Sequence, residues 1–320
     1  MPPTGAFNLE VWTGGAPYPT VPAAGYQGLA ILGPGGTSIT LDSGVFAVAD
    51  LATGGQQDTI TALGDDETIS ASPGNNDAYG AGDAITGGGA DTINVYGNNA
   101  TVNGADNAWV YAGTGNDTIF IYSGSNGDTI NAGTGNNATV NGVGNATINV
   151  LGSSDSVFGG SGDNNLGNDF ARYDTVAGGI ANETLIVLGA DNNLIVGEAG
   201  TDTIIAVGSN NSIFTDTGND TINSYGIGNT VTAGIVVGTN AALINADHGS
   251  MTFVDGTNFY SDTVVGFSTA AGDTINLSTN HHTVSSSSLV NGDQDTQITL
   301  GDGSTILLRG ITRIDGSFFS

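Results

Sequence analysis

Cysteine and positive charge are the scarcest features of this chain of 320 residues. Because cysteine is absent, disulfides cannot stabilise the fold, and redox state says nothing about the compartment. Lysine and arginine together number 3 against 31 acidic residues, which gives a formal net charge of −28. This balance excludes a basic surface for nucleic acid, and it disfavours anionic lipid or polysaccharide as a partner unless a cation bridges the two.

Long apolar runs and catalytic motifs are also missing. No apolar run is long enough to span a bilayer, so no membrane span is predicted. Residues 1–6 lack the positive and apolar segments of a secretory signal peptide, so the protein either stays inside the cell or carries an export signal elsewhere. With three histidines, no cysteine and no Gly-x-Ser-x-Gly motif, we expect a protein that is not an enzyme.

What is present is a unit of about nine residues that recurs along most of the chain. Ala112-Gly-Thr-Gly-Asn-Asp-Thr-Ile-Phe120 shows its parts. Two glycines allow a tight turn with positive φ, and a junction residue, here Asp117, supplies a carboxylate where an extended segment begins. Thr118 and Ile119 then start a β-favouring run with alternate residues on one face. The junctions keep phase from Asp58 to Asn229, mostly in steps of 8 to 11 residues.

This periodicity predicts an all-β fold. Nine residues make a turn plus a strand of about four or five residues, so two units complete a coil of about 18 residues. Stacked coils give two parallel sheets whose inward Ile and Val fill a thin core. The fold class is therefore a parallel β-roll, or β-solenoid, of nine-residue half-turns, because sandwiches and barrels need no fixed phase.

Three regions are predicted. Residues 1–50 hold six of the seven prolines and form an N-terminal β cap over the terminal apolar face, and residues 51–237 form the solenoid. Residues 238–320 begin with an irregular stretch and continue as a C-terminal antiparallel β cap, with a hairpin turn at Asp302–Gly303.

The nine-residue unit resembles the G-G-x-G-x-D-x-U-x repeat of the RTX family, the hemolysin-type calcium-binding proteins, with Ala112 in place of the first glycine. The resemblance implies Ca²⁺ between neighbouring turns, held by Asp side chains and by backbone carbonyls of the glycine-rich loops. The loop Gly159–Asp163 departs from the family pattern, because Asn164 stands where the Asp belongs. The positions that match the family's ligands are Gly87, Gly89, Asp91, Gly113, Gly115, Asp117, Asp128, Gly200, Asp202, Gly218 and Asp220.

The same resemblance extends to the C-terminus. Asp262–Phe267 and Gly272–Leu277 are similar to the segments that precede the closing strands of RTX proteins. The tail, Asp315–Ser320, resembles the acidic and then apolar signal of type I secretion. An extracellular or cell-surface protein without an N-terminal signal is what this resemblance implies.

The junction residues alternate over one part of the chain, running Asn192, Asp202, Asn211, Asp220, Asn229. Because alternate repeats stand on opposite edges of the roll, one edge would present carboxylates and the other amides. Amides can stack in hydrogen-bonded ladders without a metal, so we expect calcium at only part of the turns. The alternative is a metal-free solenoid in which Asp and Gly merely form turns.

Apolar side chains in the outward phase point to assembly. They are Trp109, Phe120, Tyr122, Ile186, Leu188, Ile205, Val207 and Phe214. Exposed apolar strips usually mark an interface, so a homo-oligomer or a self-assembled polymer is expected. Cell-surface polysaccharide bridged by Ca²⁺ is a second partner that this interpretation allows.

The function predicted is that of a secreted calcium-binding structural protein: a surface layer, a fibre or an adhesin. The alternative is a module that binds carbohydrate or ice through a flat face of Thr and Asn, with Thr92, Thr118, Thr129, Thr203 and Thr221 facing outward. A polysaccharide-modifying enzyme is disfavoured because no catalytic cluster interrupts the repeat.

Overall fold

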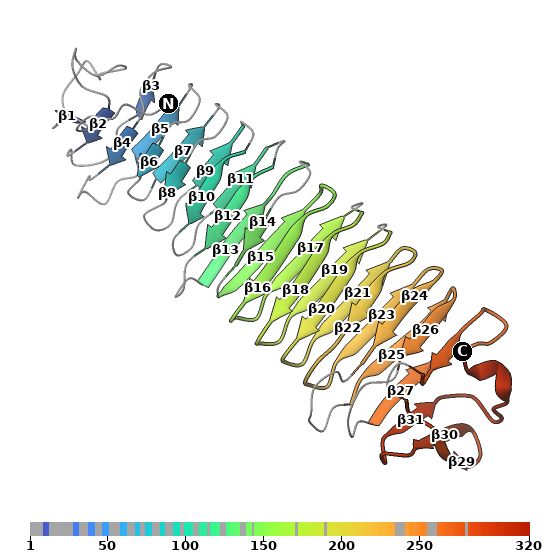
Figure 1. Ribbon diagram of the computed structural model, residues 1–320. Coiled ribbons are helices and arrows are strands. Elements are labelled where there is room, and N and C mark those ends of the chain that lie inside the picture. The colour runs from blue at the N-terminus through green and yellow to red at the C-terminus, as the bar shows by residue number, and fades with distance from the viewer. Residues whose placement is uncertain are drawn as a thin grey trace. The chain divides into compact units, whose positions relative to one another are not determined.

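The computed structural model is all-β in its described residues, apart from one turn of 3-10 helix (Figure 1). The described residues are 9–12, 28–31, 38–41, 47–50, 58–62, 68–70, 74–78, 84–86, 92–96, 99–104, 109–113, 116–121, 126–134, 139–142, 144–169, 172–188, 191–233, 241–254, 261–278 and 281–320. The chain divides into two compact units, Met1–Gly152 and Ser153–Ser320. No described helix has the length and apolarity needed to cross a membrane.

The first unit contains two sheets of parallel strands. One sheet has the order β1-β2-β4-β6-β8-β10-β12-β14, and the other has the order β3-β5-β7-β9-β11-β13-β15. The strands are β1 (Leu9–Trp12), β2 (Gly28–Ile31), β3 (Ser38–Leu41), β4 (Ala47–Asp50), β5 (Asp58–Ala62), β6 (Thr68–Ser70), β7 (Gly74–Ala78), β8 (Ala84–Thr86), β9 (Thr92–Val95), β10 (Thr101–Gly104), β11 (Trp109–Ala112), β12 (Thr118–Ile121), β13 (Asn126–Asn131), β14 (Thr139–Asn141) and β15 (Asn145–Val150).

The second unit repeats this plan and ends in antiparallel strands. One sheet has the order β16-β18-β20-β22-β24-β26-β28, and the other has the order β17-β19-β21-β23-β25-β27-β31-β30-β29. Its elements are β16 (Ser156–Gly160), β17 (Asn165–Asp169), β18 (Thr175–Gly179), β19 (Thr184–Leu188), β20 (Leu194–Glu198), β21 (Thr203–Val207), β22 (Ser212–Phe214), β23 (Thr221–Tyr225), β24 (Asn229–Thr232), β25 (Leu243–His248), β26 (Met251–Val254), β27 (Ser261–Val265), β28 (Thr274–Asn276), β29 (Val284–Val290), β30 (Asp295–Leu300), β31 (Thr305–Leu308) and the 3-10 helix η1 (Gly316–Phe318).

The alternating pattern of each strand forms the core. In β21, Ile204 and Ala206 are fully buried, while Thr203, Ile205 and Val207 are only half-buried on the outer face. The strands stack in register, so that Ile204 lies between the equally buried Leu185 of β19 and Ile222 of β23. The core is thus a set of aliphatic columns perpendicular to the strands, as the period-two pattern predicts.

The predicted β-solenoid is confirmed. Hydrogen-bonded junctions in successive coils are 17 to 22 residues apart, and the separation is 18 or 19 through much of the second unit. Strands β1 to β4 pair in parallel within the same two sheets, and β25 to β28 continue the coil beyond residue 237. The predicted turn at Asp302–Gly303 joins the antiparallel pair β30 and β31, with Gly303 at a φ of 94°.

Two neighbouring isoleucines test this core. We expect Ile204→Ala to lower the free energy of unfolding by about 3 kcal/mol, because it removes a fully buried side chain and leaves a cavity. Ile205→Ala, one residue along the strand but on the outer face, should cost less than half as much. Urea unfolding followed by far-UV circular dichroism measures both, and equal losses would contradict the inside–outside assignment.

Candidate metal centre

Of the predicted metal ligands, Asp117, Asp202 and Asp220 lie at turn-to-strand junctions, where each side chain completes the hydrogen-bond ladder between coils. At one junction, the N–H of Asp202 donates to Oδ1 of Asp220 at 2.9 Å, while the N–H of Thr221 donates to the carbonyl of Asp202 at 2.8 Å. The short Asp side chain thus satisfies a backbone donor that the turn leaves without a partner strand. In this hydrogen bond the accepting side chain belongs to one coil and the donating N–H to the coil before it.

This hydrogen bond recurs along both edges of the second unit and is also present in the first. On the β16–β28 side the pairs are Asp155 to Asp174, Asp174 to Asn193, Asn193 to Asn211, Asn211 to Asn229, and Met251 to Asp273. On the other side they are Glu183 to Asp202, Asp202 to Asp220, and Ala242 to Asp262. In the first unit Ala100 donates to Asp117.

The predicted alternation of carboxylate and amide edges is found, with one correction. The amide in the column is Asn193, whereas Asn192 is exposed and has a φ of 65°. The left-handed turn at Asn192 moves the junction one residue further along the chain than the spacing suggested. Asn193, Asn211 and Asn229 therefore follow one another on one edge, while Asp202 and Asp220 face the other.

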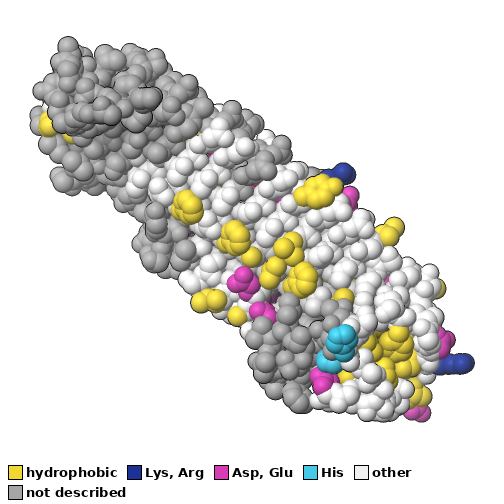
Figure 2. Space-filling view, viewed as in Figure 1, with side chains coloured by type: hydrophobic (Ala, Val, Ile, Leu, Met, Phe, Trp, Pro, Cys, Tyr) yellow, Lys and Arg dark blue, Asp and Glu magenta, His cyan; other side chains and the backbone are white. Residues whose placement is uncertain are grey.

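Many of the junction carboxylates are buried. The buried acids are Asp117, Asp128, Asp155, Asp174, Glu183, Asp202, Asp220, Asp262, Asp273 and Asp295. Correspondingly few acidic side chains show on the described part of the face in Figure 2. Acids are rarely buried unless they are paired, so most of these side chains serve the interior of the turns rather than the solvated surface.

In three of these acids one oxygen serves the ladder or turn, and the other has no hydrogen-bond donor. The second oxygens are Oδ2 of Asp117, Oε2 of Glu183 and Oδ2 of Asp202, and all three side chains are at least 99 % buried. A buried carboxylate oxygen without a donor is costly, and it is relieved either by a proton or by a cation.

Glycines on the facing strand make room for two of these oxygens. A Cβ at Gly197 would lie 2.8 Å from Oδ2 of Asp202, and a Cβ at Gly178 would lie 3.1 Å from Oε2 of Glu183. Each glycine stands five residues before its acid, at the end of the strand that enters the turn. The two oxygens therefore point into the corner of the coil, against the backbone of β18 and β20.

Glu183, Asp202 and Asp220 form an acidic column whose titration is shifted. Burial, together with a hydrogen bond and repulsion from Asp202, raises the pKa of Glu183 from 4.5 to about 8. Burial also raises the pKa of Asp202, and it raises the pKa of Asp220 to about 6 although the N–H of Asp202 opposes this shift. Without a cation, therefore, the carboxyls of Glu183 and Asp202 share a proton near neutral pH.

The glycine loops beside this column are tightly stacked. Gly200 and Gly218 have φ of 147° and 146°, and a Cβ at either would collide with a carbonyl of the preceding coil. A Cβ at these glycines would also lie 3.2 Å from Oδ1 of Asp202 and of Asp220 respectively. The glycine spacing that suggested a metal loop is therefore also required for coil-on-coil contact, whether or not a metal binds.

In the first unit the structure describes part of the predicted set. Asp117 is buried directly before β12, and Asp128 is buried within β13. Gly113 approaches the preceding coil so closely that a Cβ would lie 2.8 Å from the Val95 carbonyl. Burial raises the pKa of Asp117, and the hydrogen bond from Ala100 opposes this shift. The predicted ligands Gly87, Gly89, Asp91 and Gly115 lie outside the described residues.

The geometry of the acidic column limits how it could hold a cation. Among the described residues, no group of three or more His, Asp or Glu side chains is close enough together to hold a metal ion. Any ion in the column would therefore take few carboxylates and complete its shell with carbonyls or water, as Ca²⁺ does. Sequence reasoning did not place Glu183, Gly178 or Gly197 in this site, although the recurrent five-residue Gly-to-acid spacing was a usable signal.

Comparison with known proteins adds no name to this geometry. Neither the protein-family models nor the curated proteins include a match to the chain.

The raised pKa of Glu183 predicts a pH dependence in EGTA. Because the folded-state pKa, about 8, exceeds 4.5, its contribution to stability is complete below pH 4.5 and is lost as the pH rises through about 8. We expect Glu183→Gln to flatten the stability profile between pH 5 and about 8 relative to the wild-type protein. Urea midpoints at several pH values measure this, and an unchanged slope in Glu183→Gln would contradict it.

The close approach of Gly197 to the carboxylate of Asp202 can also be tested. Gly197→Ala should destabilise the second unit by about 1–3 kcal/mol, because the new methyl group meets the buried carboxylate of Asp202. Gly316→Ala is the control, since nothing lies within 4 Å of a Cβ there. A thermal midpoint for Gly197→Ala equal to that of the control would show that the corner has spare room.

Proposed function

We propose that this chain is a secreted, calcium-binding structural protein of the cell surface or extracellular matrix. The observation that carries the proposal is the set of buried carboxylate oxygens without hydrogen-bond donors at Asp117, Glu183 and Asp202. With 3 basic residues for 31 acids, the chain cannot neutralise them with its own cations. Ca²⁺ prefers oxygen ligands and tolerates irregular geometry, which suits an edge of carboxylates and backbone carbonyls.

In this proposal Glu183, Asp202 and Asp220 hold calcium on one edge of the second unit, and Asp117 does so in the first. The bound ion would supply the positive charge that the column lacks and would replace the shared proton of Glu183 and Asp202. Since unfolded chains hold no such column, the binding free energy would be folding free energy. Export through a type I pathway in a loose, calcium-free state, followed by folding outside, accords with this coupling.

The amide edge accords with a solenoid that is only partly loaded. Asn193, Asn211 and Asn229 make the same ladder hydrogen bonds as Asp without bringing charge. The amide Nδ2 of Asn229 also donates to the carbonyl of Gly208 and to the hydroxyl of Ser224, both at 3.1 Å. Calcium would therefore strengthen one edge while the other holds its shape unaided.

A structural role is supported by apolar rows on the outer face of the second unit. Leu188, Val207 and Tyr225 lie in register on three consecutive strands, and Ile186 and Ile205 form a second row beside them. Leu188 is exposed and the others are half-buried. Two such rows would serve lateral association between copies.

A flat ligand-binding face is the second candidate. Thr184, Thr203 and Thr221 stand in register on three consecutive strands and face outward. Hydroxyls repeated at the strand spacing of about 4.8 Å form an array that carbohydrate or ice could match. Inhibition of ice recrystallisation, or retention on a polysaccharide, would favour this candidate over assembly.

Calcium binding is tested on protein first stripped with EGTA. We expect added CaCl₂, up to about 10 mM, to raise the thermal midpoint, as weak extracellular sites do. Asp202→Asn should lose a large part of this increase because it keeps the ladder acceptor and removes the charge. The control Asp293→Asn makes the same charge change in an exposed turn. No increase with CaCl₂, or an equal loss in both variants, would refute the proposed site.

A further inference from the structure

Strand β29 (Val284–Val290) forms the free edge of the second unit's larger sheet. The sheet ends in the order β27-β31-β30-β29, and β29 pairs in antiparallel fashion with β30 alone among the described strands. Six of its seven residues are exposed, and Leu289 retains 46 % of its surface. A free strand edge presents unpaired backbone donors and acceptors that another strand can use.

The direction of these backbone groups follows from the hairpin turn. The carbonyl of Val290 accepts from the N–H of Gln294 inside the turn, so the backbone groups of Val290 face β30. Because direction alternates along a strand, Ser286 and Ser288 also face β30, whereas Ser287 and Leu289 direct their N–H and C=O groups to the free edge. A register shift between Val284 and Ser286 confines the regular edge to residues 286–290.

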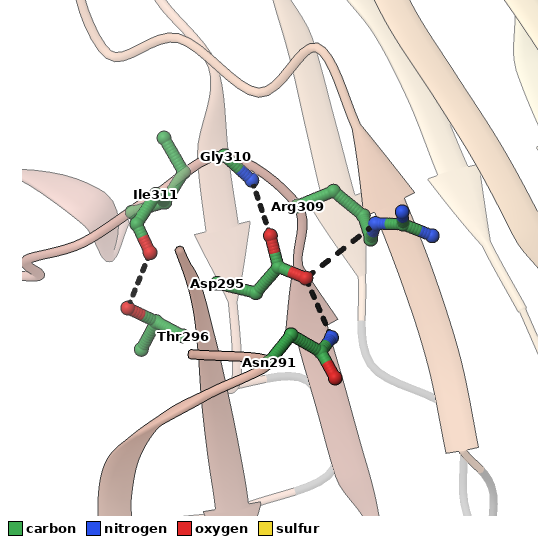
Figure 3. A network of polar contacts seen from close by, with 6 residues as sticks. All are labelled: Asn291, Asp295, Thr296, Arg309, Gly310 and Ile311. Carbon is green, nitrogen blue, oxygen red and sulfur yellow. Dashed lines mark hydrogen bonds and ion pairs between the residues drawn. The ribbon is translucent and has the colours of Figure 1, made fainter. Parts of the chain in front are cut away.

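A polar network anchors the hairpin to the rest of the unit, as Figure 3 shows. The carboxylate of Asp295 accepts from the N–H of Gly310 at 2.8 Å and from Nδ2 of Asn291 at 2.6 Å, and its Oδ2 lies 3.5 Å from Nε of Arg309. The hydroxyl of Thr296 donates to the carbonyl of Ile311 at 2.6 Å. These contacts hold both ends of the β29–β30 turn, so the free edge is presented in a fixed position.

The edge lacks the usual protection against pairing. Proteins blunt exposed edges with charged residues or proline, and Val-Ser-Ser-Ser-Ser-Leu-Val contains neither. In a chain of net charge −28, the approach of two copies is repulsive over most of the surface. An uncharged strand is where two such chains can meet at the least electrostatic cost.

We infer that β29 is a self-association site, where the β29 strands of two copies pair antiparallel about a two-fold axis at Ser288. This deepens the assembly role proposed above and rests on it. The axis places Ser287 of one copy opposite Leu289 of the other, so their outward groups form about four hydrogen bonds across the interface. The two larger sheets then become one continuous sheet.

A second copy fits this edge for two reasons. Each Leu289 meets a small Ser287, and each Val290 meets a small Ser286, so the antiparallel pairing brings no bulky or charged side chains against each other. Because β29 contains no charged residue, the axis also brings no two carboxylates of the strand together. A two-fold interface of this kind is the commonest symmetry of homo-oligomers.

The absence of cysteine makes the axis directly testable by cross-linking the full chain. In Ser288→Cys, the two thiols would face each other at a non-hydrogen-bonded pair with Cα atoms about 4.5 Å apart, which a disulfide can bridge. Ser286→Cys is the matched control on the same face, with its two copies about 13 Å apart. Under mild oxidation we expect disulfide-linked dimers from Ser288→Cys and few from Ser286→Cys on non-reducing gels.

Sedimentation velocity measures the association itself. Leu289→Lys should weaken dimerisation about tenfold or more, because it places a charge in the pairing edge. Thr269→Lys makes the same charge change in an exposed turn and should not weaken it. Circular dichroism checks that both variants fold.

The outcomes separate the two proposals. If the wild-type protein assembles but Ser286→Cys cross-links as well as Ser288→Cys, or Leu289→Lys behaves like Thr269→Lys, the inference about β29 is overturned while the structural role stands. If the wild-type protein is monomeric at all concentrations, with and without CaCl₂, both are overturned.

Discussion

The second unit depends on one recurrent hydrogen bond, in which the side chain of a junction Asp or Asn accepts the backbone N–H of the junction in the preceding coil. Asp220 and Asn211 make it equally well, at 2.9 Å, on opposite edges of the second unit. The bond closes the ladder where a turn gives way to a strand. A nine-residue unit can therefore be repeated without a larger core, because each turn is held by its neighbour.

The same bond places acids where water does not reach. Once Oδ1 of Asp202 accepts the N–H of Glu183, its Oδ2 is directed against Gly197 with no donor to meet it. In Glu183, one coil earlier, Oε1 accepts the N–H of Ala181 and Oε2 has no donor, so the two carboxyls compete for a proton. The asymmetry between the acidic and the amide edge thus follows from the choice of Asp or Asn at positions with the same backbone geometry.

A stack of coils must have a terminal strand, and in the larger sheet of the second unit this strand is β29, which contains no charged residue. In the larger sheet of the second unit, strands β17 to β27 pair with strands of neighbouring coils, and the anchored hairpin of β29 and β30 is where this pairing ends.

The sequence by itself determined the solenoid, because a period-two strand pattern held in a nine-residue phase leaves few other ways to bury Ile204 and its equivalents. It also identified Asp117, Asp202 and Asp220 as junction residues. It placed the junction amide at Asn192 rather than Asn193, because the number of residues between junctions does not reveal that Asn192 adopts a left-handed conformation in the turn. Only the tertiary structure decided which oxygens lack donors, that Gly178 and Gly197 accommodate them, and that β29 ends the sheet, since these depend on how each turn folds back on its own strand and on how the strands pair in space.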